Sequence, residues 1–137
     1  MSLPKFWKKR GTDGYIDMDK KATIDELKKE VSKFINDRDW GVRHKAKDVC
    51  MDIASEAGEL CQIFRYKTDD ECLELFKNPV RRDHIEEEIA DVFYGVLDFA
   101  SIHGIDLSTA LRNKIEKNNK KYPVETCKGD YRKYNEK

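Results

Sequence analysis

Apolar residues recur every three or four positions along most of this chain, which is the spacing of amphipathic helices. The stretch "TIDE", Thr23 to Glu26, matches a capping box and opens the first helical segment. Its apolar face carries Ile24, Leu27, Val31, Phe34 and Ile35. Further helical segments are expected at about residues 44–66, 70–77, 83–104 and 106–122. Asn78 and Pro79 are expected to end the short third segment, and Gly104 the fourth.

The pattern predicts an all-α bundle of four to five helices, because no segment alternates as a β-strand does and the connections are short. Two long segments supply most of the core, and such a chain gains core by pairing with a copy of itself. We expect completion of the bundle by homo-oligomerisation. The expected division is an irregular arm at residues 1–22, one helical domain at 23–123 and a polar tail at 124–137.

The charges of the chain balance, with 27 Lys and Arg against 27 Asp and Glu. A net charge of zero argues against a nucleic-acid partner. The four cysteines form no CxxC pair, and no apolar run is long enough for a membrane span. The beginning of the chain, "MSLPKFWKKRG", lacks the apolar run of a signal peptide. These features predict a cytoplasmic protein with no membrane partner.

The segment "VCMDIASEAGELCQIF" is mostly apolar, yet it carries Asp52, Glu56 and Glu59. On a helix, Glu56 and Glu59 lie roughly 60° apart, and Asp52 falls between them one turn earlier. Like charges at this spacing destabilise a helix by about 0.2–0.5 kcal/mol, and burying them costs far more unless a cation pairs with them. The sequence therefore predicts a positive group beside this acidic stripe.

A second stripe lies in the fourth helical segment. Its members follow one another at intervals of four, three, four and three residues, which places them on one helix face: His84, Glu88, Asp91, Gly95 and Asp98. If the two faces meet, carboxylates from both helices surround a shared point, an arrangement suited to metal ions. The predicted ligands are Glu56, Glu59, Glu88 and Asp91. Neither His84 nor Asp98 has an assigned role in this arrangement.

The types of ligand indicate which metal fits. Di-iron bundles need a Glu-x-x-His pair, which this chain lacks, and zinc favours His or Cys at spacings that neither helix supplies. All-oxygen ligands favour Mg²⁺, with Mn²⁺ as a substitute. Because Mg²⁺ keeps several waters and commonly takes its remaining ligands from phosphates, the pattern indicates nucleotide chemistry.

A solvated surface is the alternative explanation of the acids, since 39% of the residues are charged. Two acids three residues apart are common on exposed helices of such chains. The apolar surroundings of Glu56 and Glu59 favour a site instead. The small residues Ala57 and Gly58 between them are expected to allow close approach of another backbone.

Three stretches together resemble a known family: "RDWGVRHKAKDVCMDIASEAGELCQIFRY", "EEEIADVFYGVLDFA" and "KIEKNNKKYP". They are similar to the MazG-like all-α nucleoside triphosphate pyrophosphatases, most of all to the dCTP pyrophosphatase branch. The family hallmark is an ExxE pair followed, after a spacer, by ExxD. This chain has Glu56 and Glu59, then Glu88 and Asp91. The resemblance runs from about Ile24 to the tail.

The resemblance implies Mg²⁺-dependent cleavage between the α and β phosphates of a (deoxy)nucleoside triphosphate, dCTP or a modified dCTP. The products are a nucleoside monophosphate and pyrophosphate, as in house-cleaning of the nucleotide pool. The four carboxylates hold the metal, and Glu59 or Glu88 orients or deprotonates the attacking water. A homo-oligomer, tetramer or dimer, with its site near a subunit interface is also implied.

The resemblance further implies two sets of substrate contacts. Phosphate contacts come from the last long helix, from Lys114, Asn118, Lys121 and Tyr122. Base contacts come from Trp40, His44 and Tyr66. The simpler explanations are a cationic helix end that complements the helix dipole and aromatic residues that cover the core.

Three positions depart from the dCTP pyrophosphatase pattern. Val31 replaces a histidine, Tyr66 replaces a tryptophan, and Gly95 stands where a tyrosine is usual, with Tyr94 one residue earlier. These departures leave the base preference open. The alternatives are a MazG-type pyrophosphohydrolase of broad specificity and a non-catalytic helical module for metal binding or dimerisation.

Overall fold

The computed structural model describes residues 18–133 and 135, which are predominantly helical. No β-strand occurs within these ranges, so the predicted all-α class is confirmed. In chain order the elements are η1 (Met18–Lys20), α1 (Ile24–Asn36), η2 (Trp40–Arg43), α2 (Ala46–Phe64), α3 (Asp69–Lys77), α4 (Pro79–Ile102), α5 (Leu107–Lys121) and α6 (Val124–Cys127).

Side-chain caps fix where the helices begin. Thr23 and Glu26 form the predicted capping box of α1, and Asp106 caps α5. The short helix α3 ends at Lys77, directly before Asn78 and Pro79, as predicted. The next helix begins earlier than its predicted start at residue 83, because Pro79 also opens α4. Proline fits the first turn of a helix, where its missing N–H leaves no bond unmade, and Asn78 caps that turn.

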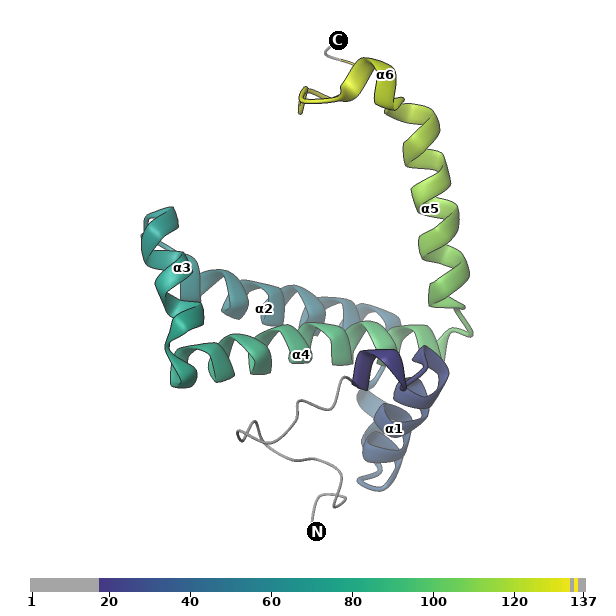
Figure 1. Ribbon diagram of the computed structural model, residues 1–137. Coiled ribbons are helices and arrows are strands. Elements are labelled where there is room, and N and C mark those ends of the chain that lie inside the picture. Colours follow the sequence, from purple (N-terminus) through teal and green to yellow (C-terminus); the bar gives the residue numbers. More distant parts are fainter. Residues whose placement is uncertain (1–17, 134, 136–137) are drawn as a thin grey trace.

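Two long helices, α2 and α4, lie side by side with opposite directions at the centre of the molecule (Figure 1). Helix α3 closes one end of this pair, and α1 packs against α4 near the other end. The helices approach most closely at Gly95, where a Cβ atom would lie 2.6 Å from Cγ1 of Ile53. By contrast, the space beside Gly58 is open, so the close approach expected there is not made within the described chain.

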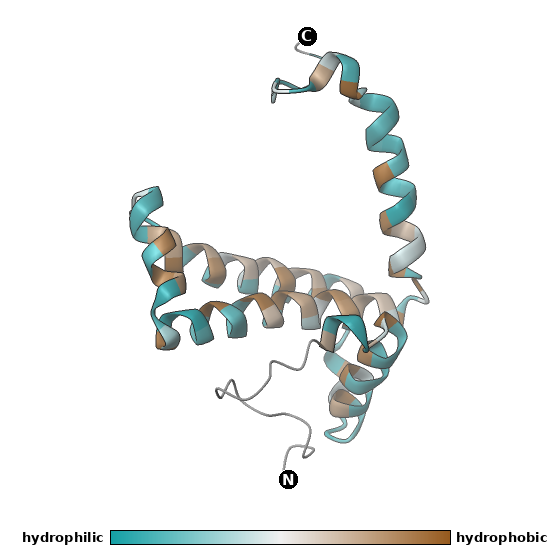
Figure 2. Cartoon of the chain, viewed as in Figure 1, coloured by the Kyte–Doolittle hydropathy of each residue, from teal (hydrophilic) through white to brown (hydrophobic). Residues whose placement is uncertain are grey.

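Few apolar side chains are buried within the described residues, and they lie mainly where α1, α2 and α4 meet. They are Ile35, Val49, Ile85, Leu97 and Ala100. Figure 2 shows that apolar residues gather along α2 and α4. Ile89, which was predicted on the buried stripe of α4, is 55% exposed. The core made by one chain is therefore smaller than the apolar pattern of the sequence predicts.

Helix α5 extends away from the α2–α4 pair and makes no extensive packing contact with it (Figure 1). Two residues of its predicted apolar face, Leu111 and Ile115, are 61% and 49% exposed. Lys28 joins α1 to the start of α5 through a hydrogen bond to the carbonyl of Ile105, at 2.9 Å. The apolar face of α5 thus lacks a covering partner among the described residues.

Two further expectations concern the ends of the chain and membranes. Of the predicted arm at residues 1–22, positions 1–17 lie outside the described residues. The predicted tail, 124–137, begins with the short helix α6. No helix within the described ranges is both long enough and apolar enough to cross a bilayer.

Candidate metal centre

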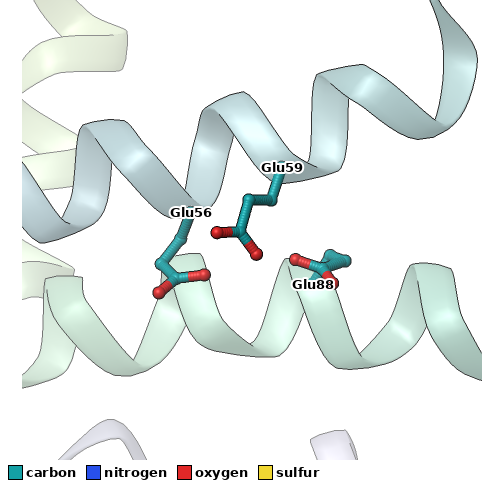
Figure 3. Close-up of side chains that lie close together, drawn as sticks. All are labelled: Glu56, Glu59 and Glu88. Carbon is teal, nitrogen blue, oxygen red and sulfur yellow. The ribbon is translucent and has the colours of Figure 1, made fainter.

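Three glutamates converge between the two central helices. Glu56 and Glu59 lie one turn apart on α2, and Glu88 faces them from α4 (Figure 3). One carboxylate oxygen from each lies within 4.8 Å of the others. The opposed directions of α2 and α4 bring together acids that are distant in sequence. Three of the four predicted ligands therefore share one site.

Glu88 shows most directly that the cluster suits a cation. Its side chain is 12% exposed, and one oxygen lies 3.5 Å from Nδ1 of His84. The other oxygen, Oε2, is buried and has no hydrogen-bond partner among the described residues. A buried carboxylate oxygen is costly without a partner, and nearby glutamates cannot supply one as anions. A metal ion would satisfy this oxygen.

The electrostatics of Glu56 agree with that interpretation. Burial raises the pKa of the Glu56 carboxyl above its ordinary value, and the negative charges of Glu59, Asp91, Glu88 and Asp52 raise it further. The metal-free cluster therefore disfavours the ionised form of Glu56. A bound cation reverses this effect because it attracts the same negative charges.

Asp91, the fourth predicted ligand, lies beside the converging oxygens. It is exposed, and its charge acts on Glu56. Asp91, Asp52 and Glu56 line a cavity of about 170 Å³ that opens next to the cluster. The position of Asp91 makes it available to a metal or to a water held by one, and its role as a ligand stays a prediction.

The residues predicted to contact the base lie at two separate places. Trp40 and His44 precede α2, whereas Tyr66 follows it. Since α2 has 19 residues, its ends are about 28 Å apart. Trp40 is half exposed and meets Phe34 edge-on, with ring centroids 5.9 Å apart. One chain cannot place Trp40 and Tyr66 on the same base.

Tyr66 combines a highly exposed ring with an unusual backbone conformation. It is 88% exposed, and its φ of 60° lies in the left-handed region that non-glycine residues rarely adopt. Arg65 lies over its ring, 4.5 Å from the centroid. The described residues of the same chain give this ring no further aromatic contact.

The residues predicted to contact phosphate lie on α5 or directly after it. They are Lys114, Asn118, Lys121 and Tyr122. Because α5 extends away from α2 and α4, the structure does not bring this set to the glutamates of the same chain (Figure 1). Their role in phosphate binding therefore stays a prediction.

One feature of this region was missed from the sequence. Asp98 on α4 is buried, and its Oδ2 lies 2.6 Å from Nδ1 of His44. Tyr94 stands one turn earlier, and burial together with the nearby Asp98 charge raises the pKa of its phenol. In the sequence, the spacing of seven residues between Asp91 and Asp98 places Asp98 on the acidic face of α4. This spacing does not indicate that His44 is its partner.

Residues 52–136 match the sequence model of the MazG-like family. Human dCTP pyrophosphatase 1 is 28% identical over 123 residues, which cover 90% of this chain and 72% of that protein. Bovine dCTP pyrophosphatase 1 is 26% identical over 121 residues, covering 88% and 72%. A solved pyrophosphatase from Archaeoglobus fulgidus matches with a TM-score of 0.68 and 34% identity, over 73% of this chain and 92% of that one.

These matches define the class of protein, since the family match extends over more than half of the chain and includes both halves of the acidic motif. The chain belongs to the MazG-like family. The enzyme class expected from the sequence, a nucleoside triphosphate pyrophosphatase, is confirmed by the same matches.

Proposed function

We propose that this protein hydrolyses dCTP or a modified dCTP to the nucleoside monophosphate and pyrophosphate in a Mg²⁺-dependent reaction. The observation that supports this most strongly is the convergence of Glu56, Glu59 and Glu88, together with the unpartnered Oε2 atom of Glu88. The two mammalian relatives bear the name dCTP pyrophosphatase 1, which favours this substrate. Removing surplus or altered nucleotides from the cytoplasmic pool is the corresponding role.

The donor set favours Mg²⁺, because the converging atoms are all carboxylate oxygens. Mn²⁺ can substitute in such a site. Glu56, Glu59 and Glu88 would hold the metal, with Asp91 beside them. A bound Mg²⁺ supplies charge neutralisation at the phosphates and activation of water.

The residues of the chain then position the reaction. Glu59 is the exposed member of the cluster, so it can reach a water on the solvent side. Glu88 is half-buried and faces Glu59 (Figure 3). We assign to these two residues the orientation and deprotonation of the attacking water. The attack on phosphorus releases pyrophosphate as the leaving group.

A second copy of the chain completes the site. The uncovered face of α5 at Leu111 and Ile115 favours a homo-oligomer, dimer or tetramer, in which this face is buried. Two further features support the same assembly, because Trp40 and Tyr66 lie at opposite ends of α2 and the phosphate-binding set lies on α5. A partner copy supplies Tyr66 to the base and Lys114, Asn118, Lys121 and Tyr122 to the phosphates.

Base selection combines stacking with polar contacts. Stacking on an aromatic ring is worth about 1–3 kcal/mol but discriminates poorly between bases. Trp40, half exposed beside Phe34, offers such a ring. Selectivity must then come from polar groups nearby, such as His44. Because Val31 and Tyr66 replace the usual residues of the dCTP pyrophosphatase branch, the proposed substrates include a modified dCTP beside dCTP.

A substrate panel tests this proposal. The protein is incubated with ribo- and deoxynucleoside triphosphates, including 5-methyl-dCTP, in Mg²⁺ with and without chelator, and the products are separated by chromatography. We expect monophosphate and pyrophosphate, fastest from the deoxycytidine nucleotides and abolished by chelator. Similar rates across the bases would favour a pyrophosphohydrolase of broad specificity. A folded, metal-binding protein without turnover would favour the non-catalytic module.

A further inference from the structure

Asp98 is the one charged residue buried among those that the structure describes, with 4% of its surface exposed. An ionised carboxylate in such a place is costly unless a donor replaces the lost water. His44 supplies that donor, because its Nδ1 atom lies 2.6 Å from Oδ2 of Asp98. The imidazole is itself largely covered, with 19% of its side chain exposed.

The pair connects parts of the chain that are 54 residues apart. His44 ends η2, where its backbone N–H donates to the carbonyl of Gly41. Asp98 therefore ties the segment that begins at Trp40 to α4. A separate hydrogen bond, 2.8 Å between the hydroxyls of Ser32 and Ser101, joins α1 to α4 nearby. The packing of α4 against its neighbours thus does not depend on the His44–Asp98 pair alone.

The ring of His44 borders the cavity beside the metal centre. Glu56 and Asp91 form part of the same cavity wall, together with Asp98. Since Nδ1 faces Asp98, Nε2 is the ring nitrogen left for another group, and the described residues give it no hydrogen bond. A carboxylate on one imidazole nitrogen fixes both the orientation and the tautomer of the ring.

We propose that Asp98 is a positioning residue for substrate binding, which holds His44 so that Nε2 contacts the nucleotide whose phosphates lie at the metal centre. This inference rests on the proposed hydrolysis of a nucleoside triphosphate. The contact forms when substrate binds and persists in the transition state. Its loss therefore raises KM and leaves kcat nearly unchanged.

Steady-state kinetics with dCTP at saturating Mg²⁺ test the role of Asp98. Asp98→Asn is expected to raise KM about tenfold, while kcat changes by less than about twofold. His44→Ala should raise KM at least as much. In the His44→Ala background, Asp98→Asn should add less than about twofold, because Asp98 acts through His44. An unchanged KM in Asp98→Asn, or the same increase in both backgrounds, overturns the proposal.

Two controls separate positioning from structural support. Ser101→Ala removes the neighbouring hydrogen bond between α1 and α4, and its KM should stay within about twofold of the wild-type value. Mn²⁺ affinity should be the same in Asp98→Asn as in the wild type, because the three glutamates are retained. A weakened metal site in Asp98→Asn would overturn the assignment to substrate positioning.

A measurement on the wild-type protein covers the case in which Asp98→Asn does not fold. The ¹⁵N NMR signals of the His44 ring, assigned by their loss in His44→Gln, should show a proton on Nδ1. A ring protonated only at Nε2 overturns the proposal. Turnover by the wild type distinguishes two failures: an inactive wild type overturns the proposed function as well, whereas an active one with unchanged KM in Asp98→Asn overturns this inference alone.

Discussion

Gly95 of α4 lies so close to Ile53 of α2 that a Cβ atom at position 95 would come 2.6 Å from Cγ1 of Ile53. Real Cβ atoms do not approach other atoms this closely, so a side chain at this position forces the helices or the isoleucine to move. The isoleucine cannot rotate away cheaply, because a β-branched side chain in a helix has one strongly preferred rotamer. The spacing of α2 and α4, and with it the distance between their glutamates, depends on this glycine.

Gly95→Ala should therefore lower the free energy of unfolding by about 1–3 kcal/mol, the range for an overpacked core. Urea unfolding at fixed protein concentration measures this change. Gly58→Ala is the matched control, because the space beside Gly58 is open. It should leave the free energy of unfolding unchanged or raise it, since alanine favours a helix by roughly 1 kcal/mol over glycine. Equal stability of Gly95→Ala and the wild type would contradict the close contact.

The raised pKa of Glu56 predicts how metal-free protein responds to pH. The folded state keeps Glu56 protonated to a higher pH than the unfolded chain, in which the pKa of this group is near 4.5. The contribution of this group to stability is present below that value and is lost as pH rises through the raised pKa. Urea unfolding in chelator should show this loss in the wild type, and Glu56→Gln should lack it.

Metal binding competes with the same proton. Mg²⁺ affinity should therefore increase as pH rises through the raised pKa of Glu56. Isothermal titration calorimetry at a series of pH values measures this dependence. An affinity independent of pH in that window would mean that Glu56 does not ligate the metal.

The uncovered face of α5 predicts assembly. Leu111→Glu places a charge on the face that we assign to a second copy, so it should shift the protein toward monomer and reduce activity. Asn113→Glu adds the same charge on the opposite side of α5 and should leave the oligomer intact. Light scattering coupled to size-exclusion chromatography measures both masses. A wild-type protein that is already monomeric at micromolar concentration would contradict the proposed assembly.

Complementation tests whether α5 serves the site of another copy. Glu59→Gln and Asn118→Ala should each be inactive alone. When the two variants are co-expressed as random dimers, about a quarter of the sites combine an intact glutamate cluster with an intact α5 and should be active. If α5 served its own chain, no mixed site would be intact. Activity no higher than that of the single variants would then be observed.

Local pattern allowed much of the fold and part of the site to be predicted. Helical periodicity located α2 and α4, and the i, i+3 spacing of acids identified Glu56, Glu59 and Glu88. The boundary at Asn78 and Pro79 was predicted, but the start of α4 at Pro79 was not, because proline both ends helices and opens them.

Contacts between residues that are distant in the sequence could not be predicted from the local spacing of apolar and charged residues. The His44–Asp98 contact spans 54 residues, and the separation of Trp40 from Tyr66 follows from the length of α2. Burial of Ile89 was predicted from an apolar stripe, but Ile89 is 55% exposed. An apolar stripe indicates which helix face packs against another element, and it does not identify that element.

The most direct measurement of the central proposal is pyrophosphate release from dCTP by the wild type and by Glu88→Gln, in Mg²⁺ and in chelator. We expect the wild type to form dCMP and pyrophosphate only with Mg²⁺, and Glu88→Gln to be at least about 100-fold slower while remaining folded. Formation of dCDP and phosphate, or undiminished turnover by Glu88→Gln, would contradict the assignment of the glutamate cluster as the catalytic metal centre.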